Sequence, residues 1–467
     1  MTPDGPVGAR GGLRGGAVSG LLGLGRLQEH LRQSPLVERR GRVVQVVGTV
    51  IEADLPGVAV GELANVGSGL GEVIGFRGHR ALLMPLGSLQ GVAHGTPVTV
   101  RSSVLSVPVG PGLLGRVVDP LGEPMDGRPL PPLPARRALL GPAPDPMQRH
   151  LIGESLSTGV RVLDGLLTLG RGQRIAVMAG SGVGKSTLMG MVARNSQASI
   201  NVVALIGERG REVREFLERD LGPEGLARSV VVIATSDASP VLQVKAMLSA
   251  LAIAEHFRDQ GADVLMMVDS LTRLAMAQRQ IGLSAGEPPT TKGYTPSVFA
   301  MMPRLLERAG PGAPHGSITG FFTVLVEGED MEDPVADTVR GIVDGHIVLS
   351  RKLGSMGHYP AIDVLQSVSR TMPSTVPPEH VAAAVRVRAL MATYRENEEL
   401  VRLGAYKQGT DPEVDTALTA WPQITRFLRQ TVEESTPLAE SQRLLATLAG
   451  VRAAAPPPAA GRRTRRV

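Results

Sequence analysis

The amino-acid sequence predicts an α/β protein with a parallel β-sheet, preceded by a small β-barrel and followed by a helical domain. Short Val-rich segments between turn residues occupy residues 41–108. Apolar runs alternate with helical patterns over residues 109–376, and helical patterns prevail over residues 377–450. The Val-rich segments are typical of an antiparallel barrel. The alternation of apolar runs with helical patterns is typical of a parallel sheet with helices on both faces. A chain of 467 residues is long enough for these domains.

The N-terminal extension, residues 1–40, begins with a Gly-rich stretch and continues into a short helical pattern. Leu21, Leu24, Leu27 and Leu31 fall at spacings that line one face of a helix. We expect this helix either to dock on a partner, or to pack against the protein's own barrel or fray, and the pattern does not choose between these alternatives.

Composition limits the class of protein. Apolar residues make up 42% of the chain and charged residues 20%, which is typical of a soluble globular protein. No apolar run is long enough to span a membrane, and the N-terminal residues contain no signal-peptide core. We therefore expect a cytoplasmic protein. The absence of Cys excludes disulfides and thiolate metal sites.

The net charge of +5 does not indicate a nucleic-acid-binding fold, because four positive charges lie at Arg462, Arg463, Arg465 and Arg466. The rest of the chain is nearly neutral. Since residues 451–467 are otherwise rich in Pro and Ala, we expect them to form a disordered basic tail.

A glycine-rich segment, A-G-S-G-V-G-K-S-T, lies at Ala179–Thr187 between a strand-like run and a helical run. Glycines allow backbone N–H groups to turn toward a phosphate, and the helix N-terminus adds positive potential. Lys185 would reach the β and γ phosphates, and the Ser186 hydroxyl would bind Mg²⁺. The segment matches the phosphate-binding motif G-x-x-x-x-G-K-[ST] except at Ala179, where the motif has its first Gly. The predicted nucleotide-binding residues are Gly180, Ser181, Gly182, Val183, Gly184, Lys185, Ser186 and Thr187. The alternative is a connection that binds nothing.

One helix of the predicted sheet domain is well marked. Ser239 can cap its N-terminus, Pro240 suits its first turn, Leu242–Phe257 is amphipathic, and Gly261 lies just past its end. Strand-like runs begin on either side of it, at Ser229 and at residue 263. This order predicts two strands joined by a covering helix.

Carboxylates at strand ends supply the other groups that phosphate chemistry needs. Asp269 ends the run D-V-L-M-M-V-D, where it could act on the metal side of a nucleotide. Glu208 ends another run and could polarise an attacking water, since ligands gather at the carboxyl edge of such sheets. Glu212 is a secondary candidate. The alternative for each acid is a helix cap or an ion pair with Arg.

Four arginines are candidates to neutralise phosphate charge: Arg209, Arg211, Arg273 and Arg370. Spacing alone does not select among them, because most arginines form surface ion pairs.

Several longer motifs carry a resemblance. With G-E-R-G-R-E, D-S-L-T-R, G-E-P-P-T-T-K-G-Y-T-P-S-V-F, D-G-H-I-V-L-S-R and G-H-Y-P-A-I-D-V-L-Q-S-V-S-R in order, the chain closely resembles the flagellum-specific ATPases of type III protein export. It resembles the catalytic subunit of rotary ATP synthases more distantly. The match covers about residues 40–440. It implies an N-terminal small β-barrel, a RecA-like P-loop ATPase core with a parallel sheet, a C-terminal helical domain and a homohexamer.

The resemblance also implies roles for single residues. Lys185 and Ser186 would serve the ATP phosphates and Mg²⁺, Glu208 would be the catalytic carboxylate, and Asp269 the metal-side acid. The non-catalytic ATP-synthase subunit typically lacks that Glu, so Glu208 implies an active Mg²⁺-dependent ATPase rather than a nucleotide-binding structural subunit.

Further implied residues surround the nucleotide. Arg209 and Arg273 resemble residues that line the phosphates. Arg370 matches the arginine finger that a neighbouring subunit donates, and Tyr359 matches the aromatic residue that stacks on adenine. Whether Tyr406 helps to complete the adenine pocket stays open.

The family's role implies an ATP-hydrolysing hexameric motor that energises export of flagellar proteins, unloads substrates from chaperones and couples to the export gate. The implied partners are a regulatory stator-like protein at the N-terminal helix, a coiled-coil stalk protein and chaperone–substrate complexes. The protein would be cytoplasmic and peripherally associated with the inner membrane.

Two alternative functions stay open. A virulence injectisome ATPase would share the chemistry and differ in cargo. An RNA translocase similar to transcription terminator Rho would need exposed aromatic residues on the barrel. Phe76 is the one aromatic residue in residues 40–108, so we expect no nucleic-acid partner.

Overall fold

A computed structural model describes residues 38–88, 90–101, 105–312, 315–326, 328 and 330–450. The predicted docking helix and the basic tail lie outside these ranges. The described residues form two compact units, a barrel unit that ends before residue 104 and a larger unit that also includes residues 84–87. None of the helices within the described ranges combines the length and hydrophobicity that a membrane span requires.

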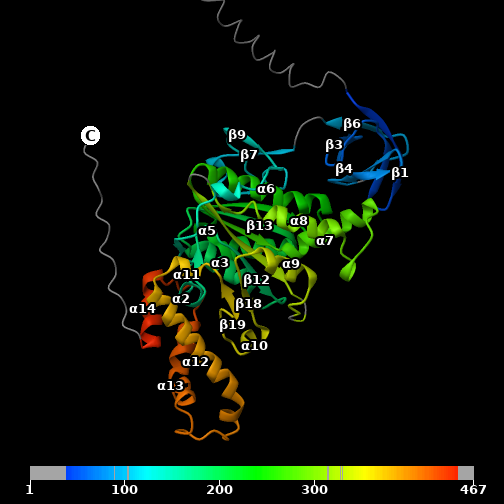
Figure 1. Cartoon of the computed structure of the whole chain (residues 1–467). Coiled ribbons are helices and arrows are strands. Elements are labelled where there is room, and N and C mark those ends of the chain that lie inside the picture. The colour runs from blue at the N-terminus through cyan, green and yellow to red at the C-terminus, as the bar shows by residue number, and fades with distance from the viewer. Residues whose placement is uncertain are drawn as a thin grey trace, which may run out of the picture. The chain divides into compact units, whose positions relative to one another are not determined.

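The barrel unit (Figure 1) is a closed six-stranded barrel. Its strand order is β1-β2-β5-β4-β3-β6. Its apolar interior includes Val43, Ile51, Leu83 and Val98. The strands are β1 Arg40–Val47, β2 Val50–Asp54, β3 Leu63–Val66, β4 Gly69–Arg77, β5 Arg80–Pro85 and β6 Pro97–Arg101.

The barrel is shorter than its sequence texture predicts. Strand β7, Ser106–Val109, pairs with β9, Ala135–Ala138, in the larger unit. The Val-rich pattern therefore continues past the barrel, and the expected boundary at residue 108 is wrong. Alternation alone does not identify the partner of a strand, which depends on pairing between segments distant in sequence.

A nine-stranded sheet forms the centre of the larger unit, in the order β19-β18-β12-β17-β15-β13-β14-β8, with β16 paired to β17. All adjacent pairs are parallel except β18 with β19 and β16 with β17. The predicted parallel sheet is thus confirmed for the strands that carry the candidate site. The strands are β8 Arg116–Val118, β12 Arg174–Ala179, β13 Ile200–Glu208, β14 Ser229–Thr235, β15 Asp263–Asp269, β16 Gly310–Pro311, β17 Ser317–Leu325, β18 Gly345–Leu349 and β19 Ile362–Ser369.

Both faces of this sheet are covered, because successive side chains of β12 point alternately into two hydrophobic cores. Ile175 and Val177 join one hydrophobic core with residues of α2 and α3, while Ala176 and Met178 join the other with residues of α6 to α9. The helices around the sheet are α2 Arg161–Leu166, α3 Lys185–Asn195, α4 Gly210–Glu215, α5 Gly222–Ala227, α6 Pro240–Asp259, α7 Leu271–Ala285, α8 Pro296–Leu306, α9 Pro334–Ile342, α10 Arg351–Ser355 and α11 Met372–Thr375.

Helix α6 begins where its capping signals predict. The Ser239 hydroxyl accepts a hydrogen bond from the Leu242 backbone N–H at 3.4 Å, and Gly261, just beyond the end, has a φ of +86°. The expected cap and stop residues of this helix are therefore confirmed.

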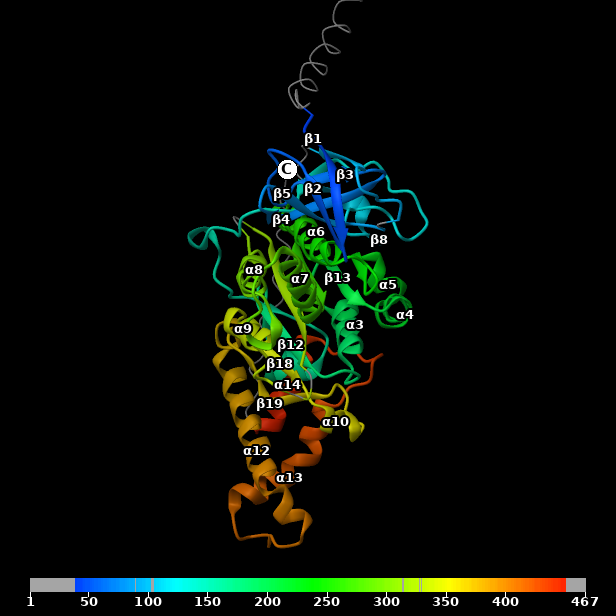
Figure 2. The same cartoon turned by 90° about the vertical axis from the view of Figure 1, so that its right-hand side faces the viewer.

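The C-terminal helices are α12 Pro378–Arg402, α13 Pro412–Leu428 and α14 Leu438–Ala449. Helices α12 and α13 lie side by side (Figures 1 and 2), and the Tyr394 and Trp421 rings stack with centroids 3.8 Å apart. These helices share the α2/α3-side core with the sheet. A Cβ on Gly165 of α2 would lie 2.7 Å from the Phe427 ring, so α13 approaches α2 closely.

The helical pattern predicted over residues 377–450 is interrupted between α13 and α14. Two helices occur, and residues 429–437 connect them. The connection is not helical, and the Gln430 side chain bonds to the backbone of residues 159 and 161, contacts that a sequence pattern does not reveal. Asp411 caps the start of α13, accepting hydrogen bonds from the Glu413 and Val414 N–H groups at 2.8 and 3.4 Å.

Candidate functional site

The glycine-rich loop lies between the carboxyl end of β12 and the start of α3. Gly182 and Gly184 have φ values of +76° and +96°, which favour glycine, and Gly184 is the N-cap of α3. Ala179 is the last residue of β12 and is buried, so its methyl group lies in the strand and not in the turn. The loop and the free N–H groups of α3 make a favourable position for an anion.

A cavity of about 340 Å³, here called the phosphate cavity, opens above this loop. Besides the loop from Gly180 through Thr187, its lining includes four of the predicted side chains: Glu208, Arg209, Glu212 and Arg273. The carboxyl ends of β12 and β13 bring these distant segments together.

Lys185 occupies the floor of the phosphate cavity. Its Nζ donates a hydrogen bond to Asp269 Oδ1 and lies 3.8 Å from Glu208 Oε1. Asp269 is only 4% exposed and also accepts a hydrogen bond from Thr323 Oγ1 at 2.8 Å. Sequence reasoning did not identify Thr323, because Thr323 and Asp269 are far apart in the sequence and no motif links them.

The Glu208 carboxyl group is a weaker acid than an ordinary glutamate, because its surroundings raise its pKa. Burial raises its pKa to about 7, the negative charge of Asp269 acts in the same direction, and the Lys185 charge opposes both. Glu212 raises the pKa further. At neutral pH, Glu208 therefore exchanges a proton readily, as a group that handles the proton of an attacking water must.

The arginine candidates differ in their burial and in whether they line the phosphate cavity. Arg273 is half-buried, and its side chain packs against Gly207, where a Cβ would lie 2.9 Å from Arg273 Cβ. Arg209 is exposed and pairs with Glu212 at 3.1 Å. Arg211 is exposed, pairs with Glu215, and is absent from the cavity lining.

Arg370 does not reach the phosphate cavity of its own chain. It follows β19, which runs antiparallel to β18, and its N–H donates to the carbonyl of Asp344, just before β18 begins. Strand β18 is parallel to β12. Arg370 is therefore at the edge where β12 begins, whereas Lys185 follows the edge where β12 ends. Its side chain is exposed.

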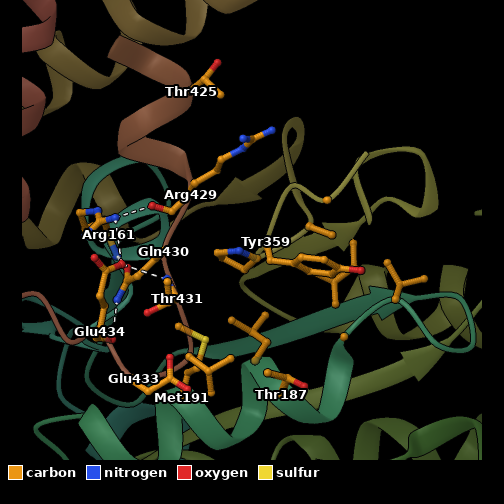
Figure 3. Close-up of a pocket in the computed structure, with 18 of the residues that line it drawn as sticks. Arg161, Thr187, Met191, Tyr359, Thr425, Arg429, Gln430, Thr431, Glu433 and Glu434 are labelled. Atoms are coloured by element: carbon orange, nitrogen blue, oxygen red, sulfur yellow. Dashed lines mark hydrogen bonds and ion pairs between the residues drawn. The ribbon is translucent and has the colours of Figure 1, made fainter. Parts of the chain in front are cut away.

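A second, larger cavity of about 1000 Å³, here called the base-side cavity, also borders the glycine-rich loop and α3. Tyr359 lines it and is 50% exposed, and in Figure 3 its ring points toward the space above Thr187 and Met191 of α3. Tyr406 is not part of the lining, and its hydroxyl donates to the Asp411 carbonyl just before α13 and to Asp415 in the first turn of α13.

Sequence reasoning missed one wall of the base-side cavity. Residues 429–434, which follow α13, and Arg161 at the start of α2 line it (Figure 3). Neither segment has a motif, and the wall arises only when the C-terminal helices fold against α2.

The donor groups around Lys185 fit Mg²⁺ that is shared with a polyphosphate. No group of three or more His, Asp or Glu side chains able to hold a metal alone occurs in the described part of the chain. Ser186 lines the cavity, and Glu208 and Asp269 provide carboxylate oxygens. Mg²⁺ prefers oxygen ligands and usually takes several from phosphate and water.

Comparison with known proteins agrees with this arrangement. Residues 159–369 match the nucleotide-binding domain and residues 43–100 the β-barrel domain of the ATP synthase alpha/beta family. Residues 376–447 match the type III secretion EscN ATPase C-terminal domain.

Two relatives are similar over most of their length. The flagellum-specific ATP synthase of Bacillus subtilis is 51% identical over 88% of this chain and 96% of its own. The type 3 secretion system ATPase of Xanthomonas euvesicatoria is 52% identical over 87% of this chain and 93% of its own.

Solved structures give the same result. The assembled ATPase EscN from the enteropathogenic E. coli type III secretion system has a TM-score of 0.84 and 44% identity, covering 88% of this chain and all of EscN. EscN in complex with its central stalk EscO has a TM-score of 0.82 and 43% identity, with the same coverage.

Proposed function

The chain belongs to the type III secretion ATPases of the ATP synthase alpha/beta family, and on this basis we propose that it is the Mg²⁺-dependent motor of flagellar protein export. The family membership makes the protein an ATPase of type III secretion. The flagellar role, the residue roles and the partners are our proposal.

One observation carries the proposal: Lys185, Glu208 and Asp269 meet at the phosphate cavity. The ATP triphosphate would lie along the glycine-rich loop, with Ser186 and Asp269 on the Mg²⁺ side. Adenine would stack on Tyr359 in the adjoining base-side cavity. Both cavities border Gly182 and Thr187, so one nucleotide can extend through both.

Hydrolysis would follow from these positions. Water attacks the γ-phosphorus while its proton passes to the Glu208 carboxylate, and the bond to the ADP oxygen breaks. The Lys185 ammonium group would leave Asp269 and bind the phosphate oxygens. Arg273 and Arg209 would add positive charge around the phosphates. Bound Mg²⁺ would neutralise part of the phosphate charge.

The exposed position of Arg370 supports a ring. Since Arg370 lies at the far edge of its own sheet, a neighbouring copy would supply it to the phosphate cavity. We propose a homohexamer around a coiled-coil stalk, and the assembled and stalk-bound EscN structures support both parts.

The remaining partners follow from the same role. Chaperone–substrate complexes would be unloaded at the ring, which would work in the cytoplasm beside the membrane export gate. A regulatory stator-like protein would bind the predicted N-terminal helix. Deleting residues 1–34 should abolish regulator binding in a pull-down and preserve the ATPase fold, and retained binding would reject this assignment.

A specific observation also favours the injectisome role, because the Xanthomonas relative is as similar as the flagellar ones. The wording of G-E-P-P-T-T-K-G-Y-T-P-S and A-D-T-V-R-G-I favours the flagellum. Neighbouring flagellar or injectisome genes would decide between the two.

The test is Mg²⁺-dependent ATP hydrolysis across a protein-concentration series, with mass measured by light scattering. Wild-type activity should rise as rings form, and Glu208→Gln and Arg370→Ala should both be inactive. Activity independent of concentration in a proven monomer would reject the ring mechanism. ATP binding without turnover in every assembly state would reject the motor.

A further inference from the structure

The connection between α13 and α14 is attached to the nucleotide-binding core by a buried amide. We call residues 429–436 the strap. Its second residue, Gln430, is only 5% exposed, although glutamine is usually found at the surface. A buried amide is stable only where its donors and acceptor are satisfied.

The Gln430 side chain meets this condition through contacts on both sides. Its Oε1 accepts a hydrogen bond from the Arg161 backbone N–H at 2.8 Å. Its Nε2 donates to the carbonyl oxygens of Gly159 and Glu434, each at 2.8 Å. The amide thus bridges the start of α2 and the far side of the strap.

The Gln430 backbone reaches the proposed base-binding residue directly. Its N–H donates to the Tyr359 carbonyl oxygen at 3.0 Å. Figure 3 shows Tyr359 across the base-side cavity from Gln430 and Thr431. The strap is therefore both a wall of the cavity and a support for Tyr359.

Arg161 holds the same strap from the core side. Its guanidinium donates to the carbonyl oxygens of Phe427 and Arg429 and to Thr436 Oγ1. The Thr436 N–H also donates to the Gly159 carbonyl at 3.0 Å. Both ends of the strap are thus tied to residues 159–161.

From this geometry we infer that Gln430 is a positioning residue for the nucleoside half of the substrate. It acts through Tyr359 and the strap, and the inference rests on the proposed position of adenine beside Tyr359. Removing the amide releases the wall and loosens the nucleoside. The phosphate cavity should keep its arrangement, because none of the strap residues is among the residues that line it.

The test compares a ligand that has a nucleoside with one that lacks it. Binding of ADP and of pyrophosphate, each with Mg²⁺, is measured by calorimetry on the full chain. Gln430→Ala should weaken ADP binding about tenfold, as expected when buried hydrogen bonds are lost, and change pyrophosphate binding less than about twofold. The matched control, Gln423→Ala, removes an exposed glutamine of α13 and should change neither.

Trp421 provides a second readout, because it is the one Trp of the chain and lies on α13 one residue before the cavity-lining Pro422. ADP should change its fluorescence in the wild type, and Gln430→Ala should reduce that change at saturating ADP. Arg161→Lys keeps the charge but loses the planar fork, and should give the same pattern to a smaller extent.

Each outcome decides the inference. Equal loss of ADP and pyrophosphate binding would make Gln430 merely structural and overturn the proposal, as would unchanged binding of both. Tyr359→Ala separates this result from failure of the proposed site. If Tyr359→Ala weakens ADP binding and Gln430→Ala does not, only the strap role fails. If Tyr359→Ala has no effect on ADP binding, the proposed adenine position itself fails.

Discussion

Lys185 and Asp269 form an ion pair at the floor of the phosphate cavity, between the first residue of α3 and the last residue of β15. The pair neutralises an acid that is almost fully buried, and Thr323 satisfies the same carboxylate oxygen. A polyphosphate entering the cavity would compete with Asp269 for the Lys185 charge. Thr323 would then remain as a partner of the acid.

Replacing Lys185 with Met should destabilise the nucleotide-free protein. Loss of the ammonium leaves Asp269 buried without a cation, and breaking such a pair costs about 2–3 kcal/mol after allowance for partial exposure of Lys185. Calorimetry should show a lower Tm than for Lys352→Met, which removes an exposed lysine on α10. The double variant with Asp269→Asn should recover part of the loss. Equal Tm values for the two lysine variants would show that the pair contributes nothing.

The rate of ATP hydrolysis should depend on the charge of Glu208. Because the pKa of Glu208 is raised to about 7, the carboxyl group is protonated at lower pH and cannot accept a proton. We expect kcat/KM to rise as pH increases through about 7 and then to level off.

Glu212→Gln offers the control for that pH profile. Glu212 raises the pKa of Glu208, so its removal should move the rising limb to lower pH. The substrate's own ionisation is the same for both enzymes and cancels in the comparison. A limb at the same pH in both would show that another group controls the profile.

Gly207→Ala should impair catalysis by displacing Arg273. The φ of Gly207 is +69°, and an added Cβ would lie 2.9 Å from Arg273 Cβ and 3.2 Å from its Cγ. Gly261→Ala is the control, since its φ is +86° but nothing lies within 4 Å of the added Cβ. Both variants should lose about 1–2 kcal/mol of stability through the left-handed backbone. Only Gly207→Ala should lower kcat/KM, by about tenfold or more. Equal activity of both variants would contradict a phosphate-side role for Arg273.

Local signals predicted the elements that depend on local chemistry. The caps of α6, the glycine-rich loop and the strand-end acids Glu208 and Asp269 could be identified because each is encoded by neighbouring residues. Parallel strands then place their carboxyl ends at one edge of the sheet, which brings these acids together.

Features that depend on distant contacts were not predictable in the same way. The pairing of β7 outside the barrel and the attachment of the strap both depend on partners distant in sequence. The hydrogen bond between Thr323 and Asp269 crosses from β17 to β15 and leaves no pattern in either strand. Propensity and periodicity describe one segment at a time, whereas these features require two.

The position of Arg370 leads to a prediction about mixed rings. Glu208→Gln removes the catalytic carboxylate, and Arg370→Ala removes the finger, so each variant alone should lose about 10³-fold or more in kcat. If the finger acts across the subunit boundary, mixing the two inactive proteins under assembling conditions should restore part of the activity. An Arg370→Ala subunit keeps Glu208 and can receive Arg370 from a Glu208→Gln neighbour. Activity should be highest near equal proportions, measured by phosphate release. If both groups acted within one chain, every mixing ratio would stay inactive, because no subunit would contain both.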